Sequence, residues 1–140
     1  MKTVTQFQDI KTEQRIEMIT DQDLKRVLSF LRGDCRDISI VEMWEEKIEK
    51  AEIIMQDEAP PDLVTMNSII RCGDSNFTLV FPREADIDQG RISILAPLGM
   101  ALLGARVGQT ISWQARDGQM RALVIDSISY QPEASGDWHL

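Results

Sequence analysis

The sequence predicts an α+β protein in which an N-terminal antiparallel helical hairpin, a short coiled coil, precedes a β-rich domain with one short helix. Three observations predict this class. Apolar residues in the first sixty positions repeat at spacings of three and four, which is the period of an amphipathic helix. Pro60 and Pro61 interrupt that pattern, since proline neither continues a helix nor lets its predecessor adopt helical angles easily. Short segments with mixed alternation follow, as in strands with one buried face. We therefore assign residues 1–61 to the hairpin and residues 62–140 to the β-rich domain.

The first helix is expected over residues 12–31, with Gly33 as its C-terminal stop. An interruption at Thr20-Asp21 is compatible with the pattern. The apolar stripe of this helix consists of Ile16, Ile19, Leu24, Val27, Leu28 and Leu31.

The second helix is expected over residues 39–56. Ser39 and Glu42 have the spacing of a capping box, and Ile38 and Met43 that of a hydrophobic staple. The connection between the helices, "RGDCRDI", is short, so the two helices should be antiparallel neighbours. A helix of about 18 residues is about 27 Å long, and we expect the hairpin to project as a short finger. The apolar face of the second helix consists of Val41, Trp44, Ile48, Ala51 and Met55.

Five strands are expected in the second half, and Asp117-Gly118 is typical of the hairpin turn between the last two. Within the apolar stretch 94–113, Pro97 suits the first turn of a short helix and Gly104 suits its end. Leu95, Ala96 and Pro97 lie where the expected strand passes into this short helix, which makes them candidates for a contact surface. The expected strands are Val64–Ile70, Phe77–Phe81, Arg91–Leu95, Thr110–Gln114 and Arg121–Ser129.

Composition and charge limit the function classes. The net charge of -8 disfavours binding to nucleic-acid phosphates, so we expect no sequence-specific DNA binding and consider a basic protein partner more plausible. No apolar run is long enough for a membrane helix, and the N-terminal residues do not read as a secretory signal. Cys35 and Cys72 are expected to be reduced thiols in a cytoplasmic protein.

The sequence lacks the usual catalytic patterns. Its only histidine, His139, is next to last, and no HExxH, CxxC, GxxxxGK or GxSxG motif occurs. We therefore expect no enzyme activity and no cofactor. Asp34 and Asp37, in the connection between the helices, leave one alternative, because two carboxylates there could hold a magnesium ion in a partner's active site. The other reading is ordinary loop chemistry of aspartates between helices.

Two blocks, "ISILAPLGMALLGARVGQTISW" and "ALVIDSISYQPEASGDWHL", resemble the C-terminal domain of the bacterial GreA/GreB transcription factors. "DLVTMNS" and "YQPEASGD" make the chain more similar to a small branch of that family, the regulators of nucleoside diphosphate kinase (Rnk). The likeness spans most of residues 62–140 and is only architectural before them.

The resemblance implies an FKBP-like domain, a curved antiparallel sheet around a short helix. It also implies binding to RNA polymerase at the rim of the secondary channel through the loop that matches Leu95, Ala96, Pro97 and Leu98. Gre factors tend to carry Asp-Ser-Pro there, whereas this chain has Leu95-Ala96-Pro97.

The leading hypothesis is a non-enzymatic transcription regulator that docks on RNA polymerase and competes with Gre-type factors. The alternative is a transcript-cleavage elongation factor in which Asp34 and Asp37 hold the catalytic magnesium, as the paired acids at the tip of a Gre coiled coil do. A third hypothesis, a prolyl isomerase, follows only from the implied fold.

Overall fold

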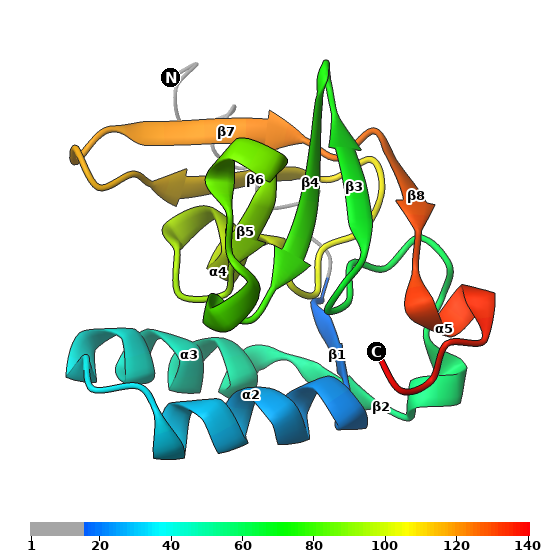
Figure 1. The fold of residues 1–140 in the computed structure, drawn as a ribbon, viewed down its shortest axis with the longest axis horizontal. Helices are drawn as coiled ribbons and strands as arrows, with labels where there is room; N and C mark the ends of the chain where they lie inside the picture. The colour runs from blue at the N-terminus through cyan, green and yellow to red at the C-terminus, as the bar shows by residue number, and fades with distance from the viewer. Residues whose placement is uncertain (1–15) are drawn as a thin grey trace, which may run out of the picture.

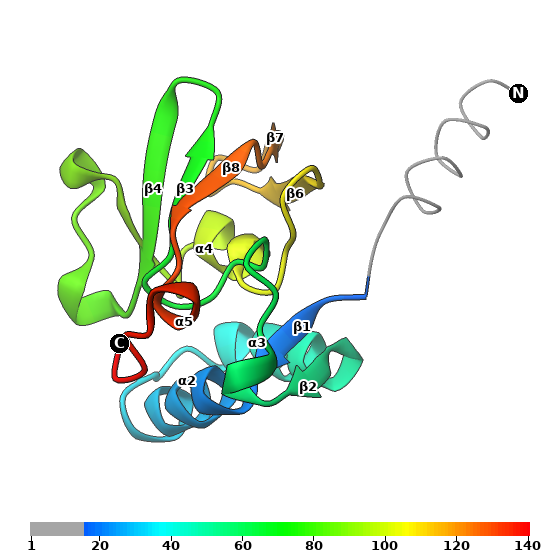
Figure 2. The ribbon, with the colours of Figure 1, turned by 90° about the vertical axis from the view of Figure 1, so that its right-hand side faces the viewer.

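The structure is a computed structural model that describes residues 16–140, and its fold is mixed α+β as predicted (Figure 1). Two antiparallel helices lie along one side of a body made of strands and short helices (Figures 1 and 2). In chain order the elements are β1 (Met18–Thr20), α2 (Asp21–Gly33), α3 (Ile38–Lys50), β2 (Glu52–Ile54), β3 (Ile69–Cys72), β4 (Ser75–Val80), β5 (Arg91–Ser93), α4 (Pro97–Leu102), β6 (Thr110–Gln114), β7 (Met120–Val124), β8 (Ser127–Tyr130) and α5 (Pro132–Ser135), with short 3-10 turns at Gln56–Glu58, Pro82–Glu84 and Ile87–Gln89.

The helical hairpin, α2 and α3, is shorter than predicted at both of its open ends. The chain is helical only from Asp21, because the Thr20 hydroxyl accepts a hydrogen bond from the Asp23 amide and caps the helix. Residues 12–15 of the predicted first helix lie outside the described residues. The predicted helix over 39–56 ends at Lys50. In place of further helical turns, β1 and β2 pair in parallel, with Met18 opposite Glu52 and Thr20 opposite Ile54, and this pairing closes the base of the hairpin.

The predicted caps of the second helix were wrong. Asp37, and not Ser39, caps α3, and its carboxylate accepts hydrogen bonds from the Ser39 and Ile40 amides. Ile38 and Met43 are 73% and 51% exposed, so they do not close a buried staple.

The strands form a four-stranded sheet in the order β5-β4-β3-β8 and a separate β6-β7 ribbon. The expectation of a purely antiparallel sheet was wrong, since β4 and β5 are parallel. The first predicted strand begins only at Ile69, because residues 64–68 turn, with Asn67 at a φ of 68°. The last predicted strand is two strands, because the amide of Ile125 bonds to Gln109 and that of Asp126 bonds to Arg71 in the other sheet. The strand Thr110–Gln114 and the turn at Asp117-Gly118 are confirmed.

The short helix α4 begins at Pro97 as predicted and packs against β4, β5 and β6. Its approach to β5 depends on Gly99, because a Cβ on that residue would lie 2.0 Å from the Ser93 carbonyl oxygen. No side chain fits at this position without moving the backbone.

One hydrophobic core joins the hairpin to the body. Trp44 is fully buried, and the Phe30 and Phe81 rings lie with their centroids 6.3 Å apart. The expectation that the hairpin projects as a finger was therefore wrong: α2 and α3 lie along the body in Figure 1, and the turned view shows them below it (Figure 2). The domain boundary between residues 61 and 62 stays a prediction. The core includes Ile19, Val27, Leu31 and Trp44 from before that boundary, and Met66, Leu79, Ile94 and Leu103 from after it.

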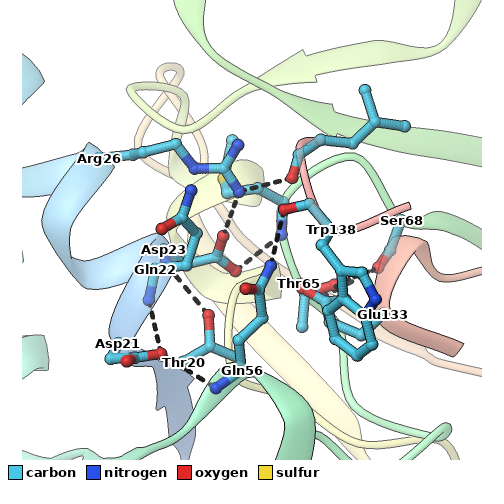
Figure 3. Close-up of polar contacts among 12 residues, drawn as sticks. Thr20, Asp21, Gln22, Asp23, Arg26, Gln56, Thr65, Ser68, Glu133 and Trp138 are labelled. Carbon is cyan, nitrogen blue, oxygen red and sulfur yellow. Dashed lines mark hydrogen bonds and ion pairs between the residues drawn. The ribbon is translucent and has the colours of Figure 1, made fainter. Parts of the chain in front are cut away.

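A buried polar network fixes the base of the hairpin to the body (Figure 3). The Asp23 carboxylate accepts a hydrogen bond of 3.0 Å from the Met66 amide and one of 2.8 Å from the Arg26 guanidinium. Arg26 also donates to the main-chain oxygen of Leu140, 2.6 Å away. The network therefore joins α2, the segment before β3 and the C-terminal tail, residues 131–140.

The C-terminal tail makes further contacts to this junction. The side-chain amide nitrogen of Gln131 donates to the carbonyls of Pro60 and Leu63. The Thr65 hydroxyl donates to the Glu133 carboxylate at 2.7 Å. The other carboxylate oxygen of Glu133 is buried and has no hydrogen-bond partner among the described residues. Burial raises the pKa of Glu133, although the Thr65 hydrogen bond opposes that shift.

We expect the free energy of unfolding of Glu133→Gln to increase relative to that of the wild type as the pH rises. The raised pKa means that the folded state holds the Glu133 proton more tightly than the unfolded state does. The wild type therefore loses stability as the pH rises from the pKa of Glu133 in the unfolded state through its higher pKa in the folded state. Glutamine does not ionise and escapes this loss. Urea unfolding of both proteins at about pH 4 and about pH 8 measures the difference. The titration of Asp23 is common to both proteins and cancels in the comparison. A difference in the free energy of unfolding that stays the same at both pH values would contradict this prediction.

We expect Gly99→Ala to destabilise the protein by about 1–3 kcal/mol or more, because the added methyl group must displace the Ser93 carbonyl. Gly33→Ala is the matched control, since a Cβ at the end of α2 meets no atom within 4 Å. There alanine should be neutral or stabilise by about 0.5 kcal/mol. Thermal unfolding of the two variants checks the contrast, and equal melting temperatures would refute the close packing of α4.

Candidate functional site

The segment Leu95–Leu98, here called the Leu95–Leu98 loop, comprises the end of the connection from β5 and the first two residues of α4, and its side chains are half-exposed. The Leu95 amide donates to the Ser93 hydroxyl at 2.9 Å, and the Ala96 amide donates to the Ser93 carbonyl at 3.0 Å. Pro97 needs no acceptor, because it has no N–H. The loop therefore presents two leucine side chains, an alanine and a proline, and the amides of Leu95 and Ala96 are bonded to Ser93.

The hairpin contacts the residue that precedes this loop. The indole N–H of Trp44, in the middle of α3, donates a hydrogen bond of 3.1 Å to the carbonyl of Ile94, the residue before the loop. The Ile94 amide donates in turn to the Val80 carbonyl on β4. Sequence reasoning had placed Trp44 on the apolar face but had missed this bond. A buried tryptophan usually finds an acceptor for its N–H, which was the one available signal.

The two aspartates of the connection between α2 and α3 differ in their surroundings. Asp37 caps α3, and one of its oxygens accepts from the Ser39 amide, the Ile40 amide and the Ser39 hydroxyl. These hydrogen bonds, that from the Ser39 hydroxyl above all, lower the pKa of Asp37. Asp34 is the C-cap residue of α2, and its amide donates to the Phe30 carbonyl. The pair thus has an evident structural use at the helix ends.

The described part of the chain contains no group of three or more side chains suited to hold a metal ion. Within residues 16–140 no helix combines the length and the apolar character needed to cross a bilayer. An open depression on the outer face of α2 is lined by Lys25, Leu28, Ser29, Arg32 and Gly33. It has no aromatic lining residue, so it gives the prolyl isomerase hypothesis no support.

Known proteins resemble the chain in both sequence and fold. A family model described as "Transcription elongation factor, GreA/GreB, C-term" matches residues 58–130. The regulator of nucleoside diphosphate kinase of Escherichia coli (strain K12) is 33% identical over 130 residues, which cover 88% of this chain and 96% of that protein. Transcription elongation factor GreA of Geobacillus kaustophilus (strain HTA426) is 31% identical over 93 residues, which cover 62% of this chain and 59% of that factor.

A solved structure gives the same result. The prokaryotic transcription elongation factor GreA/GreB from Nitrosomonas europaea matches with a TM-score of 0.66 at 32% identity, and the match covers 84% of this chain and 100% of that chain. The resemblance predicted from the quoted blocks, including the likeness to regulators of nucleoside diphosphate kinase, is confirmed. Because the family model matches residues 58–130 and the Escherichia coli relative is matched over 96% of its length, this chain belongs to the GreA/GreB family of transcription elongation factors.

Proposed function

We propose that this chain is a transcription regulator that binds RNA polymerase near its secondary channel through the Leu95–Leu98 loop. It competes there with Gre-type factors and catalyses no reaction itself. The observation that carries the proposal is the geometry of the loop in a member of the GreA/GreB family. Its apolar side chains are half-exposed, and the backbone where it begins is held by hydrogen bonds to Ser93 and Trp44. The proposal keeps the expectation of a cytoplasmic protein.

The loop suits a contact that depends on shape and apolar surface. Leu95, Ala96, Pro97 and Leu98 carry no charge, so they lose little hydration when a partner covers them. Because the loop backbone is already ordered, little conformational entropy is lost when it binds a partner. The rest of the chain carries a net charge of -8, which favours a partner surface with basic residues around the apolar contact.

The hairpin favours regulation by occupancy over transcript cleavage. Its two helices have 13 residues each, about 20 Å, and they lie along the body. Asp37, one of the two acids required by the cleavage hypothesis, caps α3. We therefore infer that the chain acts by occupying the site that a Gre factor would use.

We expect Leu98→Asp to raise the Kd for purified RNA polymerase by about tenfold or more, because a carboxylate would have to be desolvated in an apolar contact. Competition with a labelled Gre factor measures the Kd. Met120→Asp is the control, because Met120 is an exposed apolar residue on β7 outside the loop. Equal affinities of wild type and Leu98→Asp would reject the loop as the contact.

We expect arrested elongation complexes to keep their RNA length when the wild-type chain is added. The matched test of the cleavage hypothesis is the Asp34→Asn, Asp37→Asn double variant, since asparagine still caps a helix but no longer offers a carboxylate to magnesium. Shortening of the RNA by the wild type, lost in the double variant, would replace our proposal by the cleavage function. Electrophoresis of the labelled transcripts distinguishes the two.

A further inference from the structure

We propose that Trp44 is a positioning residue through which the helical hairpin holds the Leu95–Leu98 loop in the conformation that binds its partner. This inference rests on the proposed function of the loop and assigns a role to the hairpin within it. The hairpin then stabilises the conformation of the contact surface.

The argument begins with the position of Ile94. Its amide is bonded to β4 through the Val80 carbonyl, and its carbonyl is bonded to the hairpin through the Trp44 indole. Ile94 is fully buried, whereas the four residues after it are half-exposed. The buried Ile94 and the half-exposed residues after it therefore meet at a peptide group whose carbonyl accepts a hydrogen bond from the hairpin.

Loss of the indole N–H would leave the Ile94 carbonyl buried without that donor. A buried acceptor that loses its partner carries its full desolvation cost, so the backbone gains by turning toward water or toward another donor. A turn of this peptide group reorients Leu95 and Ala96 directly. Their amides bond only locally, to Ser93, and this local pair can move together.

The effect on binding follows from the population of the competent loop. The apparent Kd equals the intrinsic Kd divided by the fraction of molecules in the binding conformation. A partner cannot contact Trp44 directly, because its side chain is fully buried. Any change in affinity on its substitution must therefore pass through the loop or through global unfolding.

The experiment compares Trp44→Phe with Val27→Ala. Phenylalanine keeps an aromatic ring at the site but has no N–H, whereas Val27 is a buried hairpin residue whose side chain makes no hydrogen bond. Both variants should melt below the wild type. Only Trp44→Phe should accelerate hydrogen exchange of the Leu95 and Ala96 amides and raise the Kd for RNA polymerase, each by about fivefold, the equivalent of one ordinary hydrogen bond.

Two further variants distinguish failure of this inference from failure of the proposed loop contact. Trp44→Phe should add nothing to the Kd of Leu98→Asp, because both changes act on the same contact. Benzothienylalanine at position 44 keeps the shape of the indole and lacks the N–H, so it should reproduce the fivefold effect if phenylalanine disturbs the packing. Unchanged exchange and affinity with benzothienylalanine would overturn this inference while the loop contact stands. No binding by the wild type would overturn both.

Discussion

The rest of the structure depends on the packing of the helical hairpin lengthwise against the body. Two short helices cannot bury their apolar faces against each other alone, and here the body supplies the remaining surface. Three contacts fix the hairpin along its length: the Asp23 carboxylate at the Met66 amide, the Trp44 indole at the Ile94 carbonyl, and the Phe30 ring beside Phe81. The first two are directional, so they determine the angle of the hairpin as well as its attachment.

The sequence predicted the features that depend on local chemistry. Pro97 and Gly104 defined a short helix in an apolar stretch, and Asp117-Gly118 defined a hairpin turn, because each of these residues restricts the backbone at its own position. The apolar spacing of three and four also revealed the helical faces that carry Val27 and Trp44. The resemblance in the C-terminal half added the family, which no single motif could have shown.

What the sequence left open depends on contacts between distant residues. Glu52 to Ile54 continue the helical spacing, and only their pairing with Met18 to Thr20 makes them a strand. The parallel pairing of β4 with β5 follows from a crossover whose path no local signal encodes. Asp23 was an ordinary polar position within a helix, and its burial appears only when the Met66 amide reaches it. No pattern in the tail indicated that Gln131 and Glu133 would join it to the segment before β3, at Pro60, Leu63 and Thr65.

The pairing of β1 with β2 has a consequence for how chains of this kind can vary in length. Because the two ends of the hairpin are joined by backbone hydrogen bonds at its base, residues inserted between Gly33 and Asp37 would leave the three sheets and the core unaltered. Each additional turn on both helices would carry the connection about 5.4 Å further from the body. The reach of such a protein can thus change by insertion at one exposed connection, while the Leu95–Leu98 loop keeps its geometry.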